Sequence, residues 1–148
     1  MSTRKIDLAY LAGYFDADGC VSISLNGRTL NVKVSISGRN MPLCTRLKDT
    51  FGGGIDVNAH EVISWNAYSR DAQAFLQYVG PYAIYKQLQV KLSLIILDTT
   101  EEPVRRYKAA LGVCRLNQRN LAKPQVTKTM GKLTALILEG GSGQEGDL

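Results

Sequence analysis

The segment from Ile6 to Gly19 is short, mostly apolar and ends in acidic residues, and it constrains the fold more than any other stretch of the chain. Its larger apolar residues recur at the i, i+3, i+4, i+7 spacing of one helix face. These residues are Leu8, Leu11, Ala12 and Phe15. The spacing predicts a helix over residues 6–18, with Gly19 as a left-handed cap after the last turn.

Small residues on this helix predict a close contact with another backbone. They are Ala9, Ala12 and Gly13. A glycine in a helix interior costs about 1 kcal/mol relative to alanine. The presence of Gly13 therefore indicates that a second backbone passes close by.

The acidic end of the helix is unusual because the helix macrodipole is negative there. Asp16 and Asp18 indicate a positive group nearby, either a divalent cation or a Lys or Arg side chain from elsewhere in the fold. Residues two apart do not face the same way on a helix, so the pair is not by itself a two-carboxylate site. We expect one of the two to carry the chemistry.

Size and composition favour a single globular domain. We expect this domain over residues 1–138 of the 148, followed by a disordered Gly-rich tail over 139–148. No apolar run approaches the ~20 residues of a membrane span, and the polar start is not a secretory signal. Three widely spaced cysteines indicate neither a disulfide framework nor a zinc site. We therefore expect an intracellular protein with no membrane partner.

Basic residues are concentrated towards the C-terminus of a chain whose net charge is +5. Between Pro103 and Leu138 there are eight basic residues and no Asp or Glu. Such a region attracts a polyanion, although a solvated basic helix surface would have the same composition.

Two hairpins follow the first helix, because the apolar period changes from helical to two. Alternation predicts strands over residues 20–26, 30–37, 55–60 and 63–70. Helices are predicted over residues 40–51, 70–79, 86–97, 101–121 and 130–138. This order predicts an α+β fold, αββαββα with C-terminal helices, in which a four-stranded antiparallel sheet packs one face on helices and exposes the other.

The exposed sheet face is rich in short or planar hydrogen-bonding side chains, which suit base edges and phosphates in the major groove of DNA. A bare polar sheet face is the alternative. Together with the basic C-terminal third, the pattern favours DNA contact. The residues predicted to contact DNA are Ser22, Ser24, Asn26, Arg28, Asn31, Lys33, Ser35, Ser37, Arg39, Asn58, His60, Ser64, Asn66, Tyr68, Arg70, Lys123 and Lys128.

The nine residues from Leu11 to Gly19, LAGYFDADG, resemble the LAGLIDADG motif, and the element order is similar to the core of LAGLIDADG homing endonucleases. The match keeps Leu11, Ala12, Gly13, Asp16, Asp18 and Gly19. The resemblance extends over about residues 6–100.

In that family the motif helices of two domains pack side by side at small residues, and the second acid of each motif binds a divalent metal ion. Because this chain contains one motif, the resemblance implies a homodimer with a seam at Ala9, Ala12 and Gly13. It also implies a Mg²⁺ site at Asp18, with the Ala17 carbonyl as a further ligand and with Mn²⁺ or Ca²⁺ able to substitute for binding. Asp16 is then expected to cap or brace the helix end.

The implied activity is site-specific hydrolysis of double-stranded DNA at a long, roughly palindromic target, without a small-molecule substrate. Lys86 resembles the family's basic catalytic residue near the scissile phosphate. The family often has a glutamine at the end of the second strand, where this chain has Ser37-Gly38-Arg39-Asn40 and no glutamine. Either Arg39 or Asn40 substitutes for it, or the position is not used. The implied location is the cytoplasm, nucleoid or organelle of an intron host.

Two other classes of function stay open. One is a non-cleaving nucleic-acid-binding protein of the same fold, such as an RNA maturase. The other is an oligomeric interaction domain in which the first helix is only a dimer seam, a view that leaves the polar sheet face unexplained.

Overall fold

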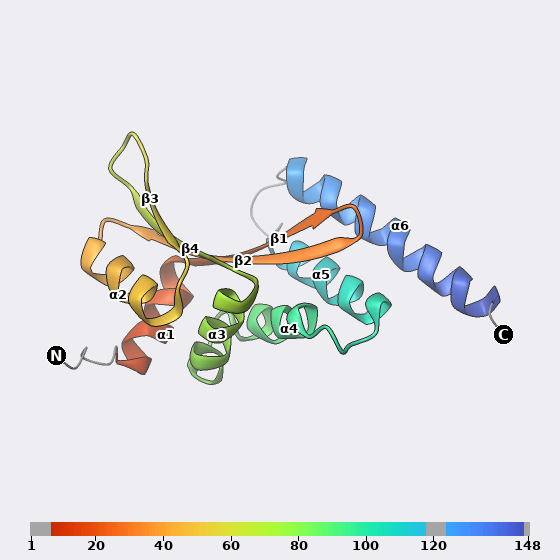
Figure 1. The fold of residues 1–148 in the computed structure, drawn as a ribbon, viewed down its shortest axis with the longest axis horizontal. Coiled ribbons are helices and arrows are strands. Elements are labelled where there is room, and N and C mark those ends of the chain that lie inside the picture. Colours follow the sequence, from red (N-terminus) through yellow and green to blue (C-terminus); the bar gives the residue numbers. More distant parts are fainter. Residues whose placement is uncertain (1–6, 118–123, 147–148) are drawn as a thin grey trace.

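The computed structural model describes residues 7–117 and 124–146, and the order of its elements confirms the predicted α+β fold (Figure 1). The elements are α1 (Leu8–Asp18), β1 (Gly19–Asn26), β2 (Thr29–Gly38), α2 (Met41–Phe51), β3 (Gly54–Val57), β4 (Ile63–Tyr68), α3 (Ser69–Val79), the 3₁₀ turn η1 (Gly80–Tyr82), α4 (Gln87–Leu97), α5 (Pro103–Asn117) and α6 (Pro124–Gly146).

The four strands form one antiparallel sheet in the order β1-β2-β4-β3. The pairing register of the strands places apolar and polar side chains on opposite faces of the sheet, as the alternation in the sequence predicts. Val34 pairs with Val21 and Ala67, and all three side chains are buried. On the other face, Lys33 pairs with Ser22 and with Tyr68. One face is therefore apolar and one polar, as expected for a sheet covered on one side.

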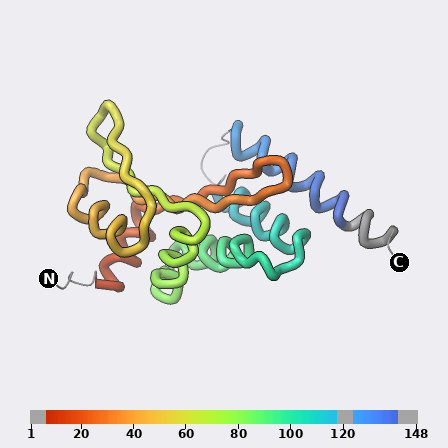
Figure 2. Tube along the Cα trace, in the orientation of Figure 1, coloured from red at the N-terminus to blue at the C-terminus, as the bar shows by residue number. Residues whose placement is uncertain are grey.

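Helices cover the apolar face. Helices α1, α3 and α4 contact β2, and α5 contacts β1, so these four helices lie on the same side of the sheet (Figure 1). The core beneath the sheet contains Phe15, Trp65 and Phe75, whose rings pack edge-on or tilted with the Phe75 centroid 5.3 Å from Phe15 and 5.1 Å from Trp65. Figure 2 shows the β1–β2 hairpin running past α5 and α6.

The first helix differs from its prediction at both ends. It begins at Leu8 because Asp7 is its N-cap and accepts a hydrogen bond from the Tyr10 amide at 3.0 Å. Ile6 lies outside the described residues. Gly19 is extended, with φ −82°, and is not a left-handed cap. Glycine is required there for a steric reason, because a Cβ would lie 2.3 Å from Cδ1 of Phe15.

The second hairpin is shorter than predicted. Strand β3 ends at Val57, and β4 ends at Tyr68. The Asn58 side chain accepts hydrogen bonds from the amides of His60 and Val62, at 2.8 and 3.0 Å. These bonds satisfy turn amides locally and compete with the strand ladder.

The last helix is longer than the predicted helix over 130–138. It begins at Pro124, a residue suited to the first turn, and its backbone is helical as far as Gly146. The disordered tail expected over 139–148 stays a prediction, and residues 147–148 lie outside the described part. No helix in the described part of the chain is long and apolar enough to cross a membrane.

Candidate functional site

The two acids at the end of α1 face different surroundings. The Asp16 carboxylate accepts hydrogen bonds from the backbone amides of Ile84 at 2.8 Å and Lys86 at 3.0 Å. Asp16 therefore braces the segment that enters α4 against the end of α1, in the role expected for it.

Lys86 lies at the acid end of α1. Its Nζ donates a hydrogen bond to the Asp16 carbonyl at 3.0 Å and lies 5.2 Å from the centre of the Tyr85 ring. The ammonium group offsets the negative end of the helix macrodipole. The positive group expected from the sequence is thus, within one chain, a lysine from elsewhere in the fold.

Asp18 is exposed, and within the described residues no hydrogen bond or ion pair engages its carboxylate. Ala17 is also exposed and lies in the last turn, where carbonyl groups lack intrahelical partners. Nowhere in the described residues do three or more His, Cys, Asp or Glu side chains gather into a metal site. A single chain therefore offers one free carboxylate at this end.

Tyr14 lies one turn before Asp18, at a variable position of the motif. Burial raises the pKa of its phenol, the negative charge of Asp18 raises it further, and a hydrogen bond with the Asn40 side chain opposes the rise. Its hydroxyl oxygen lies 3.0 Å from the position that a Cβ would take on Gly38. The i, i+4 spacing of Tyr14 and Asp18 is the sequence signal that could have identified it.

The proposed seam residues divide between two faces of α1. Ala9 and Gly13 are exposed, and nothing lies within 4 Å of a Cβ placed on Gly13. Ala12 is 2% exposed and packs in the chain's own core, so its assignment to the seam needs correction. The reason is its angular position beside Leu11 and Phe15 on the buried face.

Part of the polar sheet face is bonded internally. The Ser35 hydroxyl donates to Asn66 Oδ1 at 2.6 Å, and Asn66 Nδ2 donates to Asp56 at 2.9 Å. Asn66 is 8% exposed, so its amide is not free to read a base in this state, contrary to expectation. The Ser37 and Ser64 hydroxyls hydrogen-bond to each other at 2.9 Å.

Other predicted contact residues lie off the sheet. Arg70 is in the first turn of α3, and His60 and Asn58 lie in the loop between β3 and β4. Arg39 is exposed between β2 and α2. Lys123 lies outside the described residues.

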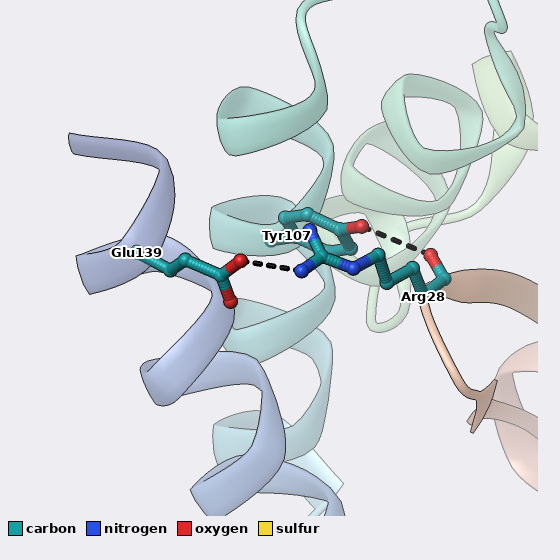
Figure 3. Close-up of polar contacts among 3 residues, drawn as sticks. All are labelled: Arg28, Tyr107 and Glu139. Atoms are coloured by element: carbon teal, nitrogen blue, oxygen red, sulfur yellow. Dashed lines mark hydrogen bonds and ion pairs between the residues drawn. The ribbon is translucent and has the colours of Figure 1, made fainter. Parts of the chain in front are cut away.

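Arg28, at the tip of the β1–β2 hairpin, is engaged by the C-terminal helices (Figure 3). Its guanidinium group forms an ion pair with Glu139 of α6, and its carbonyl accepts a hydrogen bond from the Tyr107 hydroxyl at 2.9 Å. These contacts fix the hairpin tip against α5 and α6. The guanidinium group is therefore paired within the chain.

A groove runs between the polar face of β1 and the start of α6. Its sheet side includes Ser22, Ser24, Lys33 and Tyr68, and Lys128 of α6 lies at its rim. These predicted DNA-contact residues are brought together. Asn26 is exposed at the end of β1, and Asn31 accepts a hydrogen bond from the Ser69 hydroxyl at 3.2 Å.

Sequence reasoning also missed a link behind the site. Asn117 donates a hydrogen bond to the Val21 carbonyl at 2.7 Å and accepts one from Gln89 at 3.0 Å. The link ties α4 and α5 to β1 next to the acid end of α1. No local sequence pattern marks it, because its members are distant along the chain.

The model of the LAGLIDADG endonuclease family matches residues 11–97. The fold is similar to that of the homing endonuclease I-CvuI in complex with a DNA target, with 22% identity, coverage of 86% of this chain and 94% of that one, and a TM-score of 0.65. It is also similar to the archaeal intron-encoded homing endonuclease I-Vdi141I complexed with DNA, with 18% identity, 88% and 96% coverage, and a TM-score of 0.66.

The fold is also similar to that of the LAGLIDADG meganuclease I-AabMI bound to uncleaved DNA, with 15% identity and a TM-score of 0.63. That match covers 86% of this chain and 50% of the meganuclease chain. No curated protein sequence matches the chain significantly. At these identities the structural likenesses establish the fold.

Proposed function

Because the chain belongs to the LAGLIDADG endonuclease family, whose model matches residues 11–97, we propose that it is a homodimeric, Mg²⁺-dependent, site-specific endonuclease acting on double-stranded DNA. One observation carries the proposal. Within the described residues, the Asp18 carboxylate is exposed and unpaired at the end of the motif helix. In the same last turn, the Asp16 carboxylate is occupied as a brace, and the Asp16 carbonyl accepts a hydrogen bond from Lys86 Nζ.

The donor set at this end fits a hard divalent cation. Asp18 supplies a carboxylate and Ala17 a backbone carbonyl, and oxygen ligands of these kinds suit Mg²⁺, which retains several waters. We assign these two residues as its ligands, with Mn²⁺ or Ca²⁺ able to replace it for binding. When bound, the ion supplies activation of water and neutralisation of charge on the phosphate.

Lys86 is assigned the role of stabilising negative charge on the phosphate during cleavage. Its Nζ uses one hydrogen to bond the Asp16 carbonyl, and an ammonium group has two more to donate. The Asp16 brace restricts the backbone of Lys86, so the charge is held in place before DNA binds.

The dimer supplies the second half of the site. We assign the seam to the exposed small residues of α1, which are Ala9 and Gly13 with Ala17 one turn further on. These lie four residues apart and form a stripe that allows two backbones to approach closely. A two-fold axis through this stripe would place two Asp18 residues together and select a roughly palindromic target.

The polar sheet face and the groove beside α6 form the proposed DNA interface. Ser22, Ser24, Lys33, Tyr68 and Lys128 supply hydrogen-bonding groups and positive charge along one surface. Phosphate contacts would come from the lysines and base contacts from the shorter side chains. The I-CvuI and I-Vdi141I structures, which contain DNA, support this assignment by analogy of fold.

Selection of cleaved molecules from a randomised DNA library with Mg²⁺ tests the proposal. We expect recovery of one roughly palindromic sequence, cleaved in both strands. Absence of cleavage products with Mg²⁺ or Mn²⁺ would contradict the endonuclease assignment. Binding of DNA or RNA without cleavage would favour the maturase or another non-cleaving function.

A further inference from the structure

Arg28 extends from a short hairpin tip that the C-terminal helices hold. Asn26 pairs with Thr29, which leaves residues 27 and 28 at the centre of the turn. Gly27 has φ +63°, and a positive φ at the first central position is typical of two-residue turns that match the twist of the strands. The Arg28 carbonyl accepts a hydrogen bond from the Tyr107 hydroxyl of α5 at 2.9 Å (Figure 3). These contacts fix the backbone of Arg28, so a change of partner falls to its side chain.

Glu139, which forms the ion pair with Arg28, is placed on α6 by close packing of the next residue. A Cβ on Gly140 would lie 2.5 Å from Cγ2 of Val104, so α6 and α5 approach closely beside Glu139. The paired side chains of Arg28 and Glu139 are nevertheless 71% and 55% exposed. Ion pairs between exposed side chains are weak, because the surrounding water screens both charges. A phosphate group can therefore compete with the carboxylate for the guanidinium group.

Glu139 lies on the face of α6 that borders the groove. Lys128 and Lys132 of this helix line the groove together with the end of β1. A helix turns by about 100° per residue, so residues 128, 132 and 139 fall within about 40° of one another. Glu139 is also the first acid after residues 103–138, which contain eight basic residues and no Asp or Glu. It therefore opposes a polyanion at the hairpin-tip end of a surface that otherwise attracts one.

We propose that Glu139 restrains Arg28 as a reserve phosphate contact. In the free protein the Glu139 carboxylate pairs with the guanidinium group, and DNA that fills the groove as far as the hairpin tip must displace the carboxylate. The planar guanidinium group suits phosphate as well as carboxylate, through the same pairs of N–H groups. This inference rests on the proposed DNA-binding function. Its consequence is that Glu139 lowers the affinity of the chain for DNA.

A cycle of single and double substitutions at the two positions tests the inference. The probe is a fluorescein-labelled DNA duplex of mixed sequence, titrated in EDTA so that it is not cleaved. We expect Glu139→Gln to bind roughly twofold to fivefold more tightly for each chain on the duplex, because the phosphate no longer has to break an ion pair. When Arg28→Gln is also present, Glu139→Gln should give no such gain.

Glu101→Gln is the matched control for net charge. It removes one negative charge, as Glu139→Gln does, but it breaks the pair with Arg105, whose two atoms are 3.4 Å apart. That pair lies at the start of α5, on the helix side of the sheet. Glu101→Gln should leave the affinity almost unchanged. The melting temperature of Glu139→Gln should match that of the wild type, since the pair with Arg28 is exposed.

Three results would overturn the inference. The first is a Glu139→Gln protein that binds no more tightly than Glu101→Gln. The second is weaker binding by Glu139→Gln, which would mean that the ion pair positions the hairpin tip for DNA. The third is an equal gain in the presence of Arg28→Gln, which would assign the effect to net charge alone. If the wild type binds no duplex at all, the proposed function fails instead.

Discussion

Asp16 and Asp18 are two positions apart in the sequence but have different partners in the structure. Two backbone amides hold the Asp16 carboxylate, whereas that of Asp18 is exposed and unpaired within the described residues. A helix rotates by about 100° per residue, so the two side chains diverge. The same motif therefore supplies one structural and one proposed catalytic carboxylate.

Asp18→Asn should abolish cleavage and leave DNA affinity intact or improved. The substitution removes the charge that would hold the cation, and it also removes repulsion between the carboxylate and phosphate. Cleavage with Mg²⁺ and affinity by fluorescence anisotropy give the two readouts. The control Asp49→Asn changes an exposed acid on α2 and should cleave normally. Retained cleavage by Asp18→Asn would refute the assignment.

Gly53→Ala should lower the free energy of unfolding by about 1–3 kcal/mol. The backbone of Gly53 has φ +83°, and a Cβ there would lie 2.4 Å from the Asn66 carbonyl oxygen. Gly54 is the matched control, since nothing lies within 4 Å of its added Cβ. Urea unfolding, followed by Trp65 fluorescence, measures the free energy of unfolding of the Gly53→Ala and Gly54→Ala variants. Equal effects of the two substitutions would argue against this packing.

At the scale of elements, α1 is apolar on nearly all sides and is buried on one. Leu11, Ala12 and Phe15 face the core, while Ala9 and Gly13 remain exposed. A helix that is apolar all round is normally buried all round. The exposed stripe therefore supports the proposal that a second chain covers it.

Gly13→Leu should weaken the proposed dimer more than about tenfold, or about 1.4 kcal/mol. The added side chain would separate two closely packed backbones, whereas within one chain an added Cβ at this position meets nothing within 4 Å. Sedimentation velocity over a concentration series measures the association. Ala74→Leu makes a similar change on an exposed face of α3 and should leave association unchanged. A Gly13→Leu protein that remains as dimeric as the wild type would count against the seam.

At the scale of the whole molecule, charge and topology act together. The order β1-β2-β4-β3 leaves β1 at an edge, and α6 lies beside that edge (Figure 1). Lys128 from the basic C-terminal part thereby joins Ser24 from the sheet around one groove. A cationic surface on one side of the molecule suits a polyanion.

DNA binding should weaken steeply with salt. About six phosphate contacts would give a slope near −5 for the logarithm of the affinity against that of salt concentration. Lys33→Gln and Lys128→Gln should each reduce the slope by about one. Lys91→Gln on α4, on the opposite side of the sheet, is the control. A flat salt response of the wild type would exclude groove binding.

Sequence alone determined the motif helix, both hairpins and the α+β fold, because periodicity and turn residues are local properties. It could not determine that Ala12 is buried, that Asn66 is internally bonded or that Arg28 pairs with Glu139. Those contacts join residues far apart in the chain, and only tertiary packing decides them. The same reason applies to the contact of Lys86 with the end of α1 and to that of Tyr14 with the end of β2.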